Sequence, residues 1–295
     1  MKYILTADNH FQYNQPICRT DDFITAQIDK LKFLKTLQQE HNAIILNSGD
    51  ITHKARVDKQ ELFSLLLSNM PEMYGVAGNH DLMYHSLNYL YNSAIGVLIH
   101  AGKYKFIKKE TPLSFDEDVV YGFSYGQKIE HPHIKGKNKT IAIWHNMIYT
   151  PQSTLNFTRG YHAETILQNY PEYDYILTGD NHQTFDLTLE NRTLINPGSL
   201  TRDDAAQIDH KPCVYLLDTS ANTLKKVFVP VRKGVITTEH LDVKKDRDKR
   251  LEAFIEVVNN DYEIGFVFEE NLKEYLYSNP VNDDIKKIIY ECTGI

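Results

Sequence analysis

The stretch Gly78-Asn79-His80-Asp81 is the centre of the fold prediction for this 295-residue chain. It follows the apolar run Met73–Ala77, which is typical of a short buried strand. The glycine lets the backbone turn sharply, and an amide, an imidazole and a carboxylate come directly after it. Ligands of open α/β sheets bind at the carboxyl ends of the strands. The stretch therefore predicts a binding site at the end of a buried strand.

Four further polar clusters also follow apolar runs. They are Asp8-Asn9-His10, Gly49-Asp50-Ile51-Thr52-His53, His145 after residues 141–144, and Gly179-Asp180-Asn181-His182. Each offers carboxylate, amide or imidazole ligands. Asp8 and His10 lie two residues apart, so in an extended backbone they share one face and can hold one ion. Five such clusters together predict a two-metal hydrolytic centre.

Asp50 is the natural bridging ligand, because one carboxylate can join two ions about 3.5–4 Å apart. The remaining expected metal ligands are Asp8, His10 and His182 around one ion, and Asn79, His145 and Asp180 around the other. This mixture of oxygen and imidazole ligands suits manganese best, with magnesium, iron or zinc as alternatives.

Two histidines are candidate catalytic groups. His80 stands next to a ligand but is itself free, so it could protonate the leaving alkoxide. His53 could orient the phosphate or share that proton transfer. The other histidines, among them His85 and His210, are expected to be surface or hydrogen-bonded residues.

Composition limits the function classes. The hydrophobic fraction is 42% and the net charge is −7, which argues against a broad basic surface for nonspecific DNA binding. No apolar run approaches the length of a membrane span, and the N-terminus lacks the pattern of a signal peptide. Three scattered cysteines predict reduced thiols and a cytoplasmic location.

The order of elements predicts two domains. Strands and helices alternate through residue 80, which is typical of parallel βαβ units. A loop is expected at 127–139, a polar segment that could line a substrate cleft at 146–160, and a tight turn at Asn196–Ser199. The expected later elements are short strands within 98–126, strand 140–144, helix 163–169, strand 173–178, a hairpin of 183–189 and 192–195, and strands 213–218 and 223–229.

A boundary near residue 232 separates the core, 1–232, from a small C-terminal domain, 233–295. The C-terminal domain has helical patterns at 249–259, 265–277 and 283–291.

These motifs, in this order, resemble the calcineurin-like metallophosphoesterase superfamily over about residues 1–200. Within it, the chain looks like the SbcD-type branch, the nuclease subunit of DNA double-strand-break repair. Asp81 ends the central motif, Gly49-Asp50 lacks an Asp-Arg-Gly continuation, and Asn196-Pro197-Gly198-Ser199 follows the last motif. The family normally has histidine where this chain has Asp180.

The resemblance implies an α/β fold with a two-layered β-sandwich core flanked by helices. The change in sequence character near residue 232 adds the expectation of a small C-terminal α/β cap. It also implies a dinuclear manganese site, phosphodiester cleavage, a homodimer and an SbcC-type coiled-coil ATPase as partner. By resemblance, His80 is the transition-state histidine, and the metal ligands are Asp8, His10, Asp50, Asn79, His145 and His182.

Three functions remain open. The first is a manganese-dependent DNA exo/endonuclease that acts in repair or recombination with the ATPase. The second is a phosphodiesterase or phosphatase for a nucleotide or other small phosphoester, which the negative charge favours. The third is a catalytically weakened subunit that binds DNA or a partner, which Asp180 would explain. Side chains that could contact nucleic acid, although packing or solvation explains them as well, are Tyr84, Tyr89, Tyr91, Lys135, Lys137 and Lys139.

Overall fold

The computed structural model describes residues 1–57, 60–151, 160–239, 241, 245, 249–252 and 268–293. The chain divides into two compact units, Met1–Thr237 and Thr238–Ile295. The first unit extends past residue 232 because the following segment pairs with the loop before the first helix. The Thr20 N–H donates to the Val235 carbonyl at 3.0 Å, and the Thr237 N–H donates to the Cys18 carbonyl at 2.8 Å.

The first sheet has six strands in the order β14-β13-β1-β2-β3-β4. Their bounds, in that order, are Thr223–Phe228, Cys213–Asp218, Lys2–Thr6, Ile44–Asn47, Met73–Gly75 and Tyr104–Phe106. β1, β2, β3 and β4 run parallel, as the βαβ pattern predicts, whereas β13 and β14 are antiparallel additions at one edge.

The second sheet also has six strands, in the order β11-β12-β10-β7-β6-β5. Their bounds are Phe185–Leu189, Arg192–Asn196, Tyr175–Gly179, Thr140–His145, Asp118–Phe123 and Leu113–Phe115. β7 and β10 are parallel neighbours, and β11 and β12 form the expected hairpin. A separate parallel pair consists of β8, Ile148–Tyr149, and β9, Tyr161–His162.

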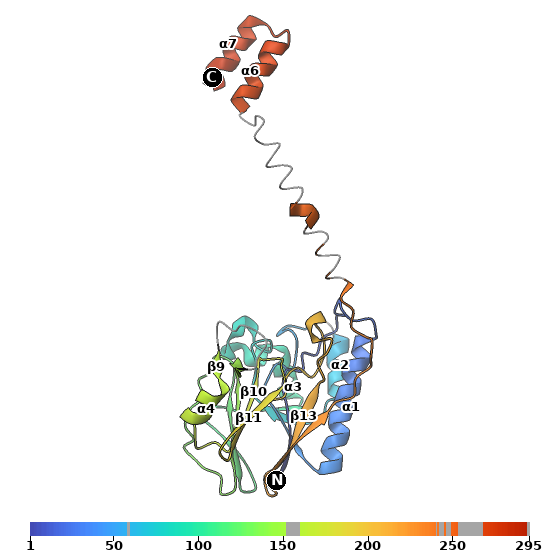
Figure 1. Cartoon of the computed structure of the whole chain (residues 1–295), viewed down its shortest axis with the longest axis vertical. Coiled ribbons are helices and arrows are strands. Elements are labelled where there is room, and N and C mark those ends of the chain that lie inside the picture. Colours follow the sequence, from blue (N-terminus) through green and yellow to red (C-terminus); the bar gives the residue numbers. More distant parts are fainter. Residues whose placement is uncertain are drawn as a thin grey trace. The chain divides into compact units, whose positions relative to one another are not determined.

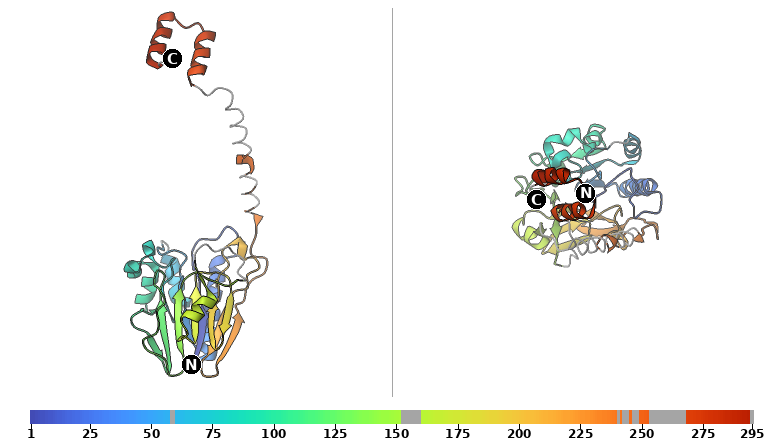
Figure 2. Two further views of the ribbon diagram at one scale, coloured as in Figure 1. Left: turned by 60° about the vertical axis from the view of Figure 1, so that its left-hand side comes forward. Right: turned by 90° about the horizontal axis from the view of Figure 1, so that it is seen from above.

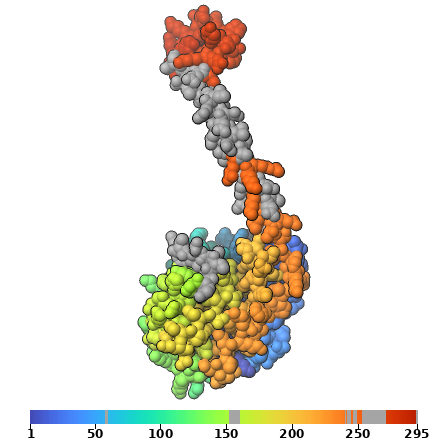
Figure 3. Space-filling view, viewed as in Figure 1, coloured from blue at the N-terminus to red at the C-terminus, as the bar shows by residue number. Residues whose placement is uncertain are grey.

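The two sheets pack face to face, so the sandwich and its flanking helices are confirmed (Figures 1 and 2). One core cluster joins Leu5 and Leu46 of the first sheet to Ile143 and Leu177 of the second. Tyr3 also bridges the layers, because its hydroxyl donates to Asp118 Oδ2 at 3.0 Å. The yellow β11–β12 region and the orange β13–β14 region adjoin on the surface (Figure 3), where Lys226 Nζ lies 3.4 Å from Asp186 Oδ1.

Helices cover both outer faces. α1, α2 and α3 pack on the first sheet and α4 packs on the second (Figure 1). Their bounds are Phe23–His41, Gln60–Asn69, Ala94–His100 and Ala163–Asn169. α3 was not predicted, since it is only seven residues long and lacks a long helical repeat. Asp22 caps α1 as expected by accepting the Thr25 N–H at 3.1 Å.

The second unit contains α6, Phe268–Ser278, and α7, Asp283–Thr293. The regular structure of its described residues is helical, so the β part of the expected α/β cap is not seen in them. Most of the helix expected at 249–259 and the start of the one expected at 265–277 lie outside the described residues. None of the helices in the described ranges combines the length and apolar character needed to cross a bilayer.

Candidate metal centre

The five polar clusters meet at one end of the sandwich. Asp8, Asp50 and Asn79 follow the parallel strands β1, β2 and β3 of the first sheet. His145 ends β7 and Asp180 follows β10 in the second sheet. Parallel strands bring their carboxyl ends to the same edge, and the packing of the two sheets brings the two edges together.

One group of possible ligands contains Asp8, His10 and His182, whose donor atoms all lie within 4.8 Å of one another. The Nε2 atoms of His10 and His182 are 3.0 Å apart. Asp8 Oδ1 accepts the backbone N–H of Asp180 at 3.0 Å, while Asp8 Oδ2 is buried without a hydrogen-bond partner. Asp8 Oδ2 is therefore free to bind an ion together with the imidazoles of His10 and His182.

Asp50 joins this group to a second one. Its Oδ1 accepts the backbone N–H of His80 at 2.9 Å. Its Oδ2 has no hydrogen-bond partner and lies 3.6 Å from His10 Nε2 and 3.5 Å from His145 Nε2. Asp50 therefore occupies the position between the two groups that a bridging ligand requires.

His145 and Asn79 form the other side of the site, where the Nε2 atom of His145 lies 2.9 Å from Asn79 Oδ1. The Nδ1 atom of His145 lies 2.6 Å from the Ser48 carbonyl, which can only accept, so Nδ1 carries the proton and Nε2 carries the lone pair. Burial lowers the pKa of His145 to about 4. The ring is therefore neutral near pH 7 and able to bind a cation.

The charge balance of the site fits divalent cations. Burial, together with neighbouring carboxylates, raises the pKa of Asp8 and of Asp50 well above the ordinary value for aspartate. Burial and nearby imidazoles lower the pKa of His10. Unpartnered buried carboxylate oxygens next to neutral imidazoles are costly on their own, and coordination of a cation removes that cost.

The backbone at these residues is unusual. Asp8, His10, Asp50 and Asp180 have φ values of 46°, 49°, 53° and 74°, in the left-handed region that non-glycine residues seldom adopt. Such conformations concentrate at functional sites, where the surrounding structure holds them. Gly49 is needed for close packing, since a Cβ on it would lie 2.6 Å from the Gly78 nitrogen.

Asp180 lies at the site, where its backbone N–H donates a hydrogen bond to Asp8 Oδ1. Its negative charge also acts to raise the pKa values of Asp8, His145 and His182. However, the groups of closely spaced acidic and imidazole atoms found in the described residues do not include its carboxylate. A ligand role for Asp180 therefore stays a prediction.

His80 and His53 lie beside His10, with ring centroids 4.8 and 5.7 Å from it. The Nδ1 atom of His80 lies 2.8 Å from the His53 carbonyl, so it carries a proton and leaves Nε2 to exchange one with a substrate. His53 Nδ1 lies 3.5 Å from Asp203 Oδ2. Sequence reasoning missed Asp203, although the charged run that follows the Asn196–Ser199 turn was a signal for it.

Asp81 has a structural role that the sequence did not reveal. The carboxylate is buried, and it accepts the backbone N–H of Thr52 and that of Gly78, each at 3.0 Å. It therefore ties the turn after β2 to the turn after β3. Burial raises its pKa to about 6.

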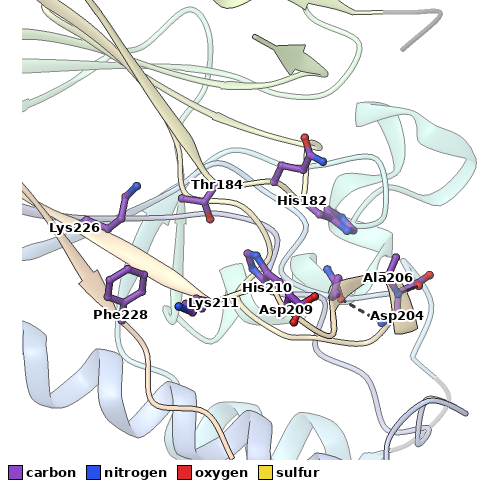
Figure 4. A pocket seen from close by; sticks show the side chains of 11 residues that line it. His182, Thr184, Asp204, Ala206, Asp209, His210, Lys211, Lys226 and Phe228 are labelled. Atoms are coloured by element: carbon purple, nitrogen blue, oxygen red, sulfur yellow. Dashed lines mark hydrogen bonds between the residues drawn. The ribbon is translucent and has the colours of Figure 1, made fainter. Parts of the chain in front are cut away.

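An open pocket of about 720 Å³ adjoins the centre, with His182 on its wall (Figure 4). Lys226 and Phe228 of β14 line one side, and His210 and Asp204 line the other (Figure 4). His210 is hydrogen-bonded, as expected, since its Nε2 lies 2.7 Å from the Ser199 carbonyl. The segment expected to line a cleft, 146–160, falls largely outside the described residues.

Residues 1–184 match the calcineurin-like phosphoesterase family. The chain belongs to this family, and the class of protein that its fold and site define is a metal-dependent phosphoesterase. No curated protein sequence matches the chain.

Solved structures that resemble this chain have low sequence identity to it. A putative 5′-nucleotidase from Staphylococcus aureus, in complex with alpha-ketoglutarate, has a TM-score of 0.50 at 13% identity over 84% of this chain and 58% of that one. An archaeal phosphodiesterase has a TM-score of 0.39 at 13% identity over 78% of this chain and 100% of that one. Vps29 complexed with zinc, from Entamoeba histolytica, has a TM-score of 0.36 at 13% identity over 78% and 98% of the two chains.

Proposed function

We propose that this chain is a manganese-dependent phosphodiester hydrolase whose substrate is DNA, a nuclease of the SbcD type. The observation that carries the hydrolase proposal is the position of Asp50 Oδ2, which is buried and unpartnered between His10 and His145. The residues that would hold one ion are Asp8, His10 and His182, and those for the other are Asn79, His145 and Asp180, with Asp50 shared. Bound ions of this kind activate a water and neutralise phosphoryl charge.

The remaining chemistry belongs to the side chains of the chain itself. His80 delivers the proton from its Nε2 to the leaving oxygen, because its Nδ1 is held by the His53 carbonyl. His53 would orient the phosphate or share the proton transfer, since its ring lies next to that of His80. Asp203 Oδ2 lies 3.5 Å from His53 Nδ1 and would position the His53 ring.

Exposed tyrosines beside the site favour DNA as the substrate. Tyr84 is 78% exposed and Tyr89 is 42% exposed, and their ring centroids are 5.2 Å apart. They follow Asp81 closely, and His85 Nδ1 lies 3.1 Å from the Asn79 carbonyl, which holds this segment at the metal centre. Aromatic rings in such a position stack on unpaired bases, each worth about 1–3 kcal/mol.

The pocket beside His182 favours a second candidate, a phosphodiesterase for a small nucleotide. Its volume of about 720 Å³ lies within the range of roughly 300–1,000 Å³ that small ligands occupy. Lys211 and the exposed ring of Phe228 line the pocket, together with Lys226, which also lies 3.4 Å from Asp186 Oδ1. Asp204 and Asp209 line it too, so its charge is mixed. The third candidate, a weakened binding subunit, depends on whether Asp180 holds an ion.

One assay separates these candidates. The full chain is incubated with manganese and with labelled single- and double-stranded DNA, or with a bis-aryl phosphodiester. Tyr84→Ala should slow cleavage of DNA about 10-fold and leave cleavage of the small diester unchanged, because it removes a stacking ring without touching the metal site. Asp50→Asn should abolish both reactions.

Cleavage of the small diester alone would favour the second candidate, and DNA binding without any cleavage would favour the third. Lys226→Ala, in the pocket beside His182, is the control variant matched to Tyr84→Ala. It should slow a small nucleotide diester more than DNA if the second candidate is correct.

The partners and the location remain part of this proposal. The SbcC-type ATPase, the homodimer and the cytoplasmic location follow from the resemblance and from the cysteine pattern. Among the described residues the three cysteines Cys18, Cys213 and Cys292 are free thiols, as expected.

A further inference from the structure

A small cavity lies beside α1, apart from the metal centre. Its volume is about 40 Å³. Its walls come from the loop before α1, the first turns of α1, the segment after Thr201 and the segment after Val229. The residues that line it include Arg19, Asp21, Asp29, Lys30, Arg202 and Arg232.

The charges around this cavity do not balance. Arg19 makes two hydrogen bonds of 2.8 Å to the Asp21 carboxylate, and Arg232 lies 3.3 Å from Asp29. These two ion pairs involve both carboxylates that line the cavity, those of Asp21 and Asp29. Arg202 donates to two backbone carbonyls, those of Ile208 and Arg232, which carry no formal charge. Lys30 and Arg202 therefore make no ion pair with a lining carboxylate, and the four basic residues of the cavity outnumber its two aspartates.

Lys30 is the unusual group of this set. Only 6% of the residue is exposed, and its Nζ has no hydrogen-bond partner. A buried ammonium without partners costs several kcal/mol. Burial, together with Arg202 and Arg19, lowers the pKa of Lys30 to about 7, so an anion in the cavity would restore its positive charge.

We propose that this cavity is a binding site for a small tetrahedral oxyanion, phosphate or sulfate, held between Lys30 Nζ and the Arg202 guanidinium. The volume corresponds to roughly three water positions, which is room for one such anion and too little for a nucleotide. The side chains of Asp29 and Arg232 are each 53% exposed, so they form the rim through which the anion enters.

The site stands independently of the proposed hydrolase function, and it has a structural consequence for the metal centre. Arg202 directly precedes Asp203, the partner of His53. An anion bound to Arg202 would therefore fix the backbone that carries Asp203, from the side of the cavity beside α1. Phosphate bound here is therefore expected to stabilise the fold even when the metal centre is empty.

The test uses the full chain without metal, in EDTA, at pH 7 and constant ionic strength. The melting temperature is measured as chloride is replaced by phosphate or by sulfate. Wild-type protein should melt about 3–6 °C higher in either oxyanion at roughly 100 times its dissociation constant. Lys30→Met should remove this shift, whereas Lys35→Met, which removes an exposed lysine of the same helix, should keep it.

An equal oxyanion shift in wild-type protein and in Lys30→Met would overturn the proposal. Equilibrium dialysis of labelled phosphate against the metal-free wild-type protein gives a second measurement that does not depend on the stability of the variant. Retention of one phosphate per chain supports the site, and no retention overturns it. Neither measurement depends on hydrolysis, so failure here leaves the proposed function unaffected.

Discussion

At the scale of single residues, the strained backbone and the unpaired atoms are found in the same place. Asp8, His10 and Asp50 combine left-handed φ values with buried polar atoms that lack hydrogen bonds. Both features destabilise the fold on their own. A bound cation would partner the free carboxylate oxygens of Asp8 and Asp50. The turns that follow the strands account for the backbone conformations, because they direct the side chains to one point.

Asp180 provides the first prediction at this scale. We expect Asp180→Ala to abolish manganese-dependent hydrolysis, with a fall of more than about 100-fold, because the second ion loses a ligand. Titration calorimetry should show one bound manganese where the wild-type protein shows two. Asp180→His, which restores the residue usual in the family, is the matched control and should keep two ions. Undiminished activity of Asp180→Ala would remove this residue from the ligand set.

Lys30 gives a prediction of pH dependence. Its pKa falls from 10.5 to about 7 in the folded protein, so between these values the unfolded chain binds one more proton. The free energy of unfolding should therefore rise from pH 7 to pH 10.5, by at most about 5 kcal/mol. The charged and titratable groups that face Lys30 are Arg19, Asp21, Asp29, Arg202, Arg232 and His210.

The measurement is urea unfolding of wild-type protein and of Lys30→Met across this pH range. The variant should lack the rise that the lysine causes. Parallel pH profiles for the two proteins would show that Lys30 has an ordinary pKa.

At the scale of elements, the end of β12 positions the loop that carries His182. The Asn196 amide nitrogen donates to the carbonyls of Asn181 and Gln183, at 2.6 and 2.7 Å. Its Oδ1 accepts from the Thr178 hydroxyl at 3.0 Å. Asn196, at the start of the tight turn expected at Asn196–Ser199, therefore holds the loop between β10 and β11 that carries His182.

We expect Asn196→Ala to lower activity about 10–100-fold, because the loop with His182 loses the two hydrogen bonds that the Asn196 amide donates to it. Stability should fall by about 1–3 kcal/mol, since buried carbonyls are left unpaired. Asn138→Ala is the control. It removes a hydrogen bond of 2.7 Å to Asp118 at the opposite end of β7, so it should cost stability without a comparable loss of activity. Equal losses of activity in both variants would contradict this role of Asn196.

At the scale of the whole molecule, the site belongs to the first unit alone. Every residue placed at the metal centre lies within Met1–Thr237. We expect a chain truncated after Thr237 to fold and to hydrolyse a bis-aryl phosphodiester at the rate of the full chain. If the second unit docks an ATPase partner, the same truncation should abolish that binding in a pull-down experiment. Loss of diester hydrolysis on truncation would show that the second unit contributes to the site.

Much of the fold was predictable because its signals are local. The apolar run Ala43–Asn47 followed by Gly49-Asp50 indicates a strand and a turn, and the structure has β2 and its turn there. α4 matches the predicted range because Ile166 and Leu167 form a short apolar face. α3 was missed because seven residues carry too little periodicity.

The roles of individual groups were harder to predict, since they depend on contacts between residues far apart in the chain. Asp203 reaches His53 across 150 positions of the sequence, and no spacing rule connects them. Asp81 lay within the central motif, but its hydrogen bonds to Thr52 and Gly78 exist only once β2 and β3 are neighbours. Lys30 showed only the pattern of a surface lysine on a helix.

The sequence by itself determined which residue types stand at the strand ends, and hence the family and the kind of chemistry. Strand ends are local features, and a turn after an apolar run places polar groups at the sheet edge wherever the sheet forms. Only the tertiary structure decided that Asp50 lies between His10 and His145 and that Lys30 is left unpaired beside Arg202. Those relations arise from the packing of one sheet on the other and of α1 on its neighbours, which no local pattern encodes.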